Sequence, residues 1–176
     1  MDGHSYREPD NLNRSSEPAK TPGSKDHIER LALAGLASTA VMTVFAYYMP
    51  MIGMTRADYA QRFGSRMTGE KAQPGSKSWL LGLAAHFIDG SAAFPAAYSR
   101  LLRPRLTGAP WLRGMQCGAG LFVVSQAVAA PLLGSGFFSS RAPERPKAIL
   151  TELISHLVYG CMLGALAGER ADIHPD

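Results

Sequence analysis

The stretch Thr151–Gly168, TELISHLVYGCMLGALAG, decides the fold. It is apolar enough to lie in a lipid bilayer, yet it carries Glu152 and His156 four residues apart. Three glycines follow at four-residue spacing, Gly160, Gly164 and Gly168, a pattern that lets a second helix approach closely. The stretch therefore predicts a membrane helix with a polar face near its start and a close-packed face near its end.

Two other stretches, Leu31–Thr55 and Gly114–Ser140, contain no charged residue. Each exceeds the roughly 20 residues that cross a hydrocarbon core. The mean hydropathy of the 176 residues is only -0.04 because the charges collect in the N-terminal block and in short connectors. The sequence predicts an all-α membrane protein whose four transmembrane helices form an up-down bundle, with spans at about 28–49, 78–99, 112–133 and 147–168.

The remaining segments are polar. Residues 1–27 are rich in Ser, Pro and Asn and predict a disordered tail, while 169–176 form a polar C-terminal end. Residues 56–67 place apolar side chains opposite a row of arginines that includes Arg62, which predicts a short amphipathic helix lying in the membrane interface. Thr55 is expected to cap this helix.

The charge balance indicates a membrane partner and no nucleic acid. The net charge of +4 comes from basic residues near helix ends, which is how membrane proteins set topology, and no RNA-binding or zinc-finger pattern is present. Four spans place both termini on one side of the bilayer. Because the connector Arg100–Arg113 is basic and carries no acid, we expect a multi-pass protein of the bacterial inner (cytoplasmic) membrane with cytoplasmic termini.

Ionisable side chains inside the second and fourth spans predict a polar layer. An acid at a helix centre costs about 2.5–3.5 kcal/mol, so such residues normally face the bundle interior and have partners. Spacings of three and four residues put each pair on one helix face. Depth counted at about 1.5 Å per residue brings the two histidines to one level, in the half nearer the 54–77 loop. The predicted layer comprises Thr43, His86, Asp89, Gln126, Glu152 and His156.

Three functions are compatible with this layer. The first is a structural or accessory membrane subunit whose helices are held in register by buried hydrogen bonds. The second is a haem b- or metal-binding electron-transfer component in which His86 and His156 act as ligands. The third is a proton-coupled or solute-conducting protein. An enzyme is not favoured, because the chain has neither a nucleophile elbow nor an HExxH motif.

Glycines in the third span complement those of the fourth. Gly114 and Gly118 repeat the four-residue spacing of Gly160 and Gly164. We expect these stripes to pack within the chain, the fourth span against the first or third, rather than to drive homodimerisation. Other membrane subunits or a homo-oligomer are further possible partners.

Several blocks resemble a known family. These are Ala34–Thr43 in the first span, His86 in the second, Pro131–Phe137 after the third, and His156–Gly160 with Leu163-Gly164 in the fourth. They resemble an uncharacterised bacterial and archaeal family of small four-helix integral membrane proteins, a domain of unknown function. The resemblance covers about Leu31–Gly168 and implies the four-span fold with one histidine on each of the second and fourth spans. It implies no activity.

Overall fold

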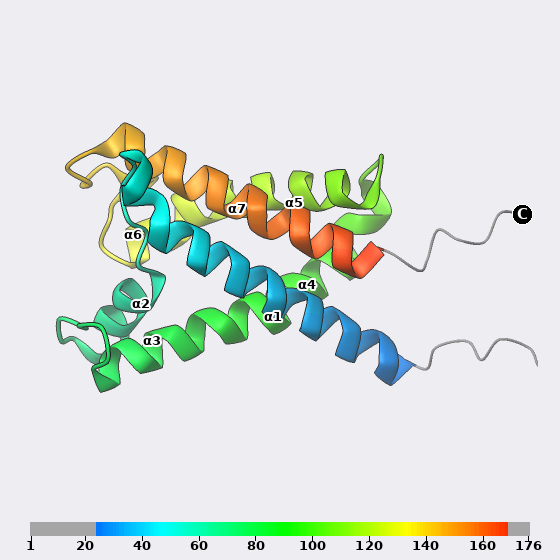
Figure 1. The fold of residues 1–176 in the computed structure, drawn as a ribbon, viewed down its shortest axis with the longest axis horizontal. Helices are drawn as coiled ribbons and strands as arrows, with labels where there is room; N and C mark the ends of the chain where they lie inside the picture. The colour runs from blue at the N-terminus through cyan, green and yellow to red at the C-terminus, as the bar shows by residue number, and fades with distance from the viewer. Residues whose placement is uncertain (1–23, 169–176) are drawn as a thin grey trace, which may run out of the picture.

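A computed structural model describes residues 24–168, and within that range the chain is helical, with turns but no strand (Figure 1). Four of its helical stretches are long and apolar enough to cross a membrane, and they alternate in direction along the chain. The predicted fold class is therefore confirmed. Residues 1–23 of the predicted tail and the predicted C-terminal end lie outside the described residues, whereas residues 24–27 are helical. The four stretches are His27–Ile52, Lys77–Arg105, Pro110–Leu132 and Arg145–Ala167.

The first and fourth spans are nearly uninterrupted, and the second and third are segmented. The first is α1 (Ser24–Tyr48) with the 3-10 helix η1 (Met49–Ile52), and the fourth is α7 (Arg145–Gly168). Between the first and second spans lies α2 (Tyr59–Thr68). The second span consists of α3 (Lys77–Ile88), η2 (Asp89–Ala93), α4 (Phe94–Ala97), η3 (Tyr98–Leu102) and η4 (Arg103–Arg105). The third consists of α5 (Pro110–Val124), η5 (Ser125–Ala129) and α6 (Ala130–Leu132), and η6 (Phe137–Ser139) follows.

Prolines explain the segmentation. The segments η2, η3 and η5 are π-helical, and a proline follows two residues after the end of each, at Pro95, Pro104 and Pro131. A proline has no N–H to donate, and its ring clashes with the carbonyl four residues earlier. A wider turn relieves this conflict, because the residue before the proline then donates to the carbonyl five residues back. Phe94 N–H, for example, donates to the Asp89 carbonyl.

The glycine stripes join α5 to α7. A Cβ at Gly114 would overlap the Gly160 carbonyl, and a Cβ at Gly160 would overlap the Gly114 carbonyl. Gly118 and Gly164 sit equally close to the opposite backbone. The fourth span therefore uses its glycines inside the chain, against the third span. Gly168 is the last residue of α7, and its surroundings are not described.

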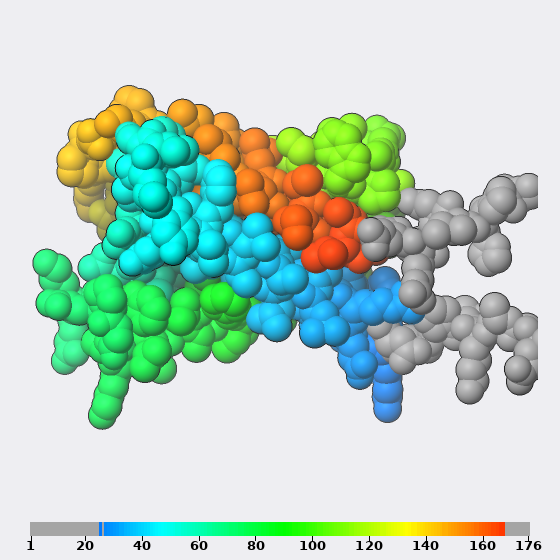
Figure 2. Space-filling view, viewed as in Figure 1, coloured from blue at the N-terminus to red at the C-terminus, as the bar shows by residue number. Residues whose placement is uncertain are grey.

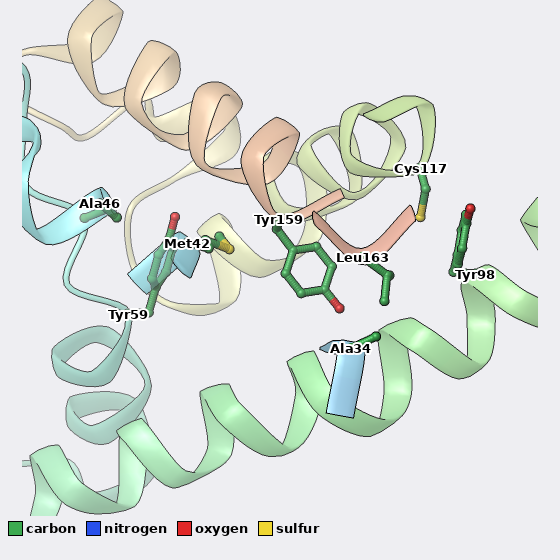
Figure 3. Packing of buried hydrophobic residues seen from close by; sticks show 9 residues of the cluster. Ala34, Met42, Ala46, Tyr59, Tyr98, Cys117, Tyr159 and Leu163 are labelled. Carbon is green, nitrogen blue, oxygen red and sulfur yellow. The ribbon is translucent and has the colours of Figure 1, made fainter. Parts of the chain in front are cut away.

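The helix α1 packs between the other spans. It runs beside α7 across the face shown in Figure 2 and crosses the second span at η2. At that crossing a Cβ on Gly35 would overlap Pro95 and the Gly90 carbonyl. Buried apolar side chains follow the long axis of the molecule from Ala46 to Tyr98 (Figure 3).

The short helix α2 exists but differs from its predicted form. It packs on α3 with almost no gap, since a Cβ at Gly82 would overlap the Ala60 carbonyl. The predicted cap at Thr55 is wrong, because the helix begins at Tyr59 and Asp58 Oδ1 accepts from Gln61 N–H at 2.8 Å. The predicted outward direction of Arg62 is also wrong, because its guanidinium reaches α7.

Candidate functional site

A cavity of about 120 Å³ lies between the spans beside α2. All four spans and α2 contribute to its wall, most of which is apolar. Five of the six side chains predicted for the polar layer line it: His86, Asp89, Gln126, Glu152 and His156. The sixth, Thr43, lies behind the wall and binds His86.

The ion pair between Glu152 and Arg62 joins a buried carboxylate of α7 to α2. Glu152 is 1% exposed, and one carboxylate oxygen accepts from Arg62 Nη1 at 2.6 Å. The other oxygen accepts from the Tyr59 hydroxyl at 3.1 Å. A buried carboxylate without such partners would be strongly destabilising. Both partners come from α2, so this helix supplies the compensating groups for the acid of α7.

The Tyr59 hydroxyl is held in its protonated form. Burial, and then the negative charge of Glu152, raise the pKa of Tyr59 well above its ordinary value. Tyr59 therefore remains a hydrogen-bond donor across the neutral pH range.

A second contact ties the start of α2 to α7. The Thr151 hydroxyl donates to the Thr55 carbonyl at 3.2 Å, and the Thr55 hydroxyl donates to Thr151 Oγ1 at 3.3 Å. Thr151 is fully buried and directly precedes Glu152. Two adjacent residues of α7 thus hold the segment that contains the first turn of α2.

His86 has one ring nitrogen occupied. Its Nε2 lies 3.0 Å from Thr43 Oγ1, and the Thr43 hydroxyl gives its single hydrogen to the Thr39 carbonyl at 2.7 Å. The proton between His86 and Thr43 therefore belongs to Nε2. The imidazole also stacks on Tyr59, with ring centroids 4.8 Å apart. His86 is thus fixed by α1 on one edge and by α2 on one face.

His156 presents a free nitrogen to the cavity. Its Nδ1 lies 2.7 Å from the Glu152 carbonyl, which can only accept, so Nδ1 carries the proton. In the neutral imidazole Nε2 is then a lone-pair acceptor. His156 thus has Nε2 without a partner among the described residues, as His86 has Nδ1.

Gln126 links the third span to the turn that follows it. The side chain is buried, and its Oε1 accepts from the Ser139 hydroxyl at 2.9 Å. Ser139 and the preceding Phe138 both have positive φ, at 52° and 47°. This hydrogen bond is one of the contacts that hold the strained turn in place.

Asp89 is the uncompensated charge of the cavity. It lines the cavity near the middle of the second span and makes no hydrogen bond or ion pair with residues 24–168. In a regular π-turn the neighbouring Gly90 carbonyl would accept a hydrogen bond from the N–H of residue 95, but Pro95 has no N–H. The Tyr159 hydroxyl donates to this carbonyl instead, at 2.7 Å. Tyr159 is therefore fixed beside Asp89.

The cavity opens toward the lipid side between the second and third spans. Phe94 and Val124 line it from these spans and are 37% and 56% exposed. The helix α3 packs on α2 and α5 packs on α7, whereas α3 and α5 do not form a packed pair. The face across which α1 and α7 run is closed by those two helices (Figure 2).

The two histidines do not form a haem site in this arrangement. The volume of about 120 Å³ is below the roughly 300–1,000 Å³ of sites for drug-sized ligands, so a porphyrin does not fit between the imidazoles. The Nε2 of His86 is already bound to Thr43. Among residues 24–168, no group of three His, Cys, Asp or Glu side chains is placed to hold a metal ion.

The roles of Arg62 and Tyr59 were not predicted from the sequence. Both lie on one face of α2 at i and i+3, which is a usable signal, but the same pattern suits a helix on a membrane surface. A buried acid requires a partner. The helix α2 follows the first span directly and carries two arginines, Arg62 and Arg66. That requirement could have identified Arg62.

Comparisons with known proteins place the chain in a family. Neither the curated proteins nor the solved structures contain a match to it. A family model, described as a family of unknown function (DUF6789), matches residues 27–175, a range that includes all four spans and the whole cavity wall. The chain belongs to this family of unknown function, DUF6789.

Proposed function

We propose that this protein is an accessory membrane subunit that binds a small, mainly apolar molecule in the cavity beside α2. The observation that carries the proposal is the division of the polar layer into two parts. Glu152, Arg62 and Tyr59 bind one another, which supports a structural role. Asp89 and the Nε2 of His156 face the cavity without partners among the described residues, which supports a role in ligand binding.

The size and the opening of the cavity support a ligand from the bilayer. An engineered apolar cavity of about 150 Å³ binds benzene, so the observed volume suits a single ring, and a substituent on that ring extends into the opening beside Phe94 and Val124. The partly exposed Phe94 and Val124 give such a molecule a route from the lipid. The partners proposed are therefore the lipid bilayer, the ligand and a second membrane subunit.

A proton- or solute-conducting function receives less support from the packing. The α5–α7 contact at Gly114 and Gly160 brings two backbones together in the half away from α2. The cavity wall does not include these residues. A conducting path between α5 and α7 is therefore closed in that half of the molecule.

We also propose that the protein resides in the bacterial inner membrane with cytoplasmic termini. The basic connector between the second and third spans supports that orientation. Cysteine labelling from each side of sealed vesicles, with Cys117 and Cys161 replaced by Ser, tests it: a cysteine at position 170 reacts only from the cytoplasmic side.

Equilibrium dialysis with radiolabelled tert-butylbenzene tests the binding function. The protein is reconstituted in lipid nanodiscs, and binding to empty nanodiscs is subtracted. Wild type is expected to bind one equivalent, and Ala130→Leu is expected to abolish this binding, because Ala130 is a buried part of the cavity wall. Ala84→Leu is the matched control, since Ala84 is exposed on α3 and outside the wall. The proposal would be refuted if samples of wild type, Ala130→Leu, Ala84→Leu and empty nanodiscs all held the same amount of tert-butylbenzene.

A further inference from the structure

The charges of the cavity wall do not cancel. Arg62 and Glu152 neutralise each other at 2.6 Å, and with neutral histidines the Asp89 carboxylate remains as the excess charge. An unpaired acid inside a span is costly, and acids there normally have a partner. Within residues 24–168 no basic side chain binds Asp89. The wall therefore carries a net negative charge, and Asp89 has no partner among residues 24–168.

We propose that this partner is the ligand, a lipophilic organic cation with an ammonium group on a small apolar body. The proposal rests on the binding function proposed above and specifies its ligand. Asp89 supplies the counter-charge, and the apolar lining holds the body of the ligand.

Aromatic rings next to Asp89 suit an ammonium group. Tyr159 is fixed to the Gly90 carbonyl, one residue from Asp89, and its ring meets Phe94 edge to face with centroids 6.4 Å apart. Both rings line the cavity. A cation close to the face of an aromatic ring is attracted by the ring quadrupole, and the attraction increases when water is excluded.

The free nitrogen of His156 adds an acceptor for a protonated amine. Its Nε2 has no hydrogen to donate because the proton lies on Nδ1, toward the Glu152 carbonyl. Asp89 and His156 thus offer a negative charge and lone pairs but no positive charge, which favours a cation over an anion. The Arg62 guanidinium does not oppose the ligand charge, because Glu152 neutralises it.

The position of Asp89 favours a free amine over a phospholipid headgroup. Asp89 lies near the middle of the span Lys77–Arg105, away from the level at which headgroups lie. A zwitterionic phospholipid would also bring a phosphate toward the carboxylates of Asp89 and Glu152. A lipophilic amine has no such group, and it can reach the opening beside Phe94 and Val124 through the acyl chains.

A pair of probes that differ only in charge tests the proposal. Trimethylphenylammonium and tert-butylbenzene have nearly the same shape, and the first carries a positive charge where the second has a carbon atom. Both are radiolabelled and dialysed against protein in nanodiscs made of a zwitterionic lipid, with empty nanodiscs subtracted. Wild type is expected to bind the cation about tenfold or more tightly than the neutral probe.

Substitutions of Asp89 separate this inference from the proposed function. Asp89→Asn is expected to bring the ratio of the two affinities to about one, and Asp89→Glu is expected to keep that ratio at about tenfold or more. Ala130→Leu is expected to lower the affinity for both probes. Equal affinities of wild type for the two probes, or a preference that Asp89→Asn retains, would overturn the inference but leave the binding function standing. If neither probe binds, both proposals fail.

A lipid without an ammonium group tests the alternative source of that group. Nanodiscs of an uncharged galactolipid have no ammonium headgroup, and we expect the protein to bind trimethylphenylammonium in them as tightly as in phosphatidylcholine nanodiscs. Markedly tighter binding in the galactolipid nanodiscs would show that a headgroup ammonium competes for the site, and it would overturn the assignment to a free amine.

Discussion

Replacement of Arg62 by Met should destabilise the protein more than replacement of its partner Glu152 by the neutral Gln. Met keeps most of the length and apolar contact of the arginine stem but removes the charge that compensates Glu152. Glu152 is 1% exposed and would retain only the Tyr59 hydroxyl as a donor from α2.

The expected magnitude follows from the unequal exposure of the two partners. Breaking a buried ion pair by removing one partner costs about 3–5 kcal/mol, and the Glu152 side chain, 2% exposed, fits that case. In Glu152→Gln the remaining charge is on Arg62, whose side chain is 28% exposed and can reach water. We expect that variant to lose about 1.5–3 kcal/mol, the range for one hydrogen bond to a charged group.

The double variant Arg62→Met/Glu152→Gln tests the cause. It should be about as stable as Glu152→Gln alone, because no uncompensated charge remains. The coupling energy between the two positions then equals the whole effect of Arg62→Met, about 3–5 kcal/mol. Lys147→Met is the control, since the Lys147–Glu144 pair is exposed and should contribute less than about 1 kcal/mol.

Denaturant unfolding in detergent, monitored by tryptophan fluorescence, measures these differences, and thermal unfolding repeats them. For a chain of this size about 2–4 °C in Tm corresponds to 1 kcal/mol, so Arg62→Met should lower Tm by roughly 6–20 °C. The reasoning is refuted if Arg62→Met and Glu152→Gln are equally mild, or if their effects simply add in the double variant.

Three further predictions concern other contacts. Gly160→Ala should destabilise the protein, because the added Cβ overlaps the Gly114 carbonyl. Gly120 has open space around it, so Gly120→Ala should be neutral or stabilise the protein by up to about 1 kcal/mol. Thermal unfolding of the two variants measures the difference. Above about pH 10 the free energy of unfolding should fall as pH rises, because Tyr59 loses its proton in the unfolded chain and keeps it in the native state. Below that pH the contribution of Tyr59 to stability is complete. The free energy of unfolding measured over a pH series should decline less steeply for Tyr59→Phe than for wild type. Tyr159→Phe should cost about 1–3 kcal/mol in denaturant unfolding by leaving the Gly90 carbonyl without a donor, and less in a Pro95→Ala background, where the missing N–H is restored.

The sequence was sufficient for the spans and for the identity of the α5–α7 contact residues. Runs without charge have one stable solution in a bilayer, because every backbone group must be satisfied within a helix. Glycines at four-residue spacing define a stripe whatever the partner is. The choice of the third span over the first as that partner depends on how the helices are arranged, which the stripe alone does not encode.

Depth counting was sufficient to gather the polar side chains but not to assign their partners. Rise per residue placed His86 and His156 at one level, and both line the cavity. The partners of Glu152 were missed because amphipathic composition describes α2 equally well on a membrane surface and against α3. The close approach of Gly64 and Gly82 settles that question, and neither glycine lies in a stripe that the sequence makes visible.

The π-helical segments also could not be predicted from the sequence. Pro95 predicts a disturbed helix but does not say how the disturbance is absorbed. In the structure the turn widens, the Gly90 carbonyl is freed, and Tyr159 from the fourth span binds it. The outcome depends on a residue of another helix, so a local rule could not give it.

Solid-state NMR in lipid bilayers tests most directly that α2 carries Arg62 into the interior to neutralise Glu152. A distance measurement between ¹⁵N-labelled arginine side chains and ¹³C-labelled glutamate carboxyl groups reports this pair, and Arg62→Met assigns it. The account predicts strong dephasing of the Glu152 carboxyl signal, as expected for a direct ion pair with a 2.6 Å N–O distance, and its loss in Arg62→Met. A Glu152 carboxyl signal with no arginine nitrogen nearby in wild type would contradict the account.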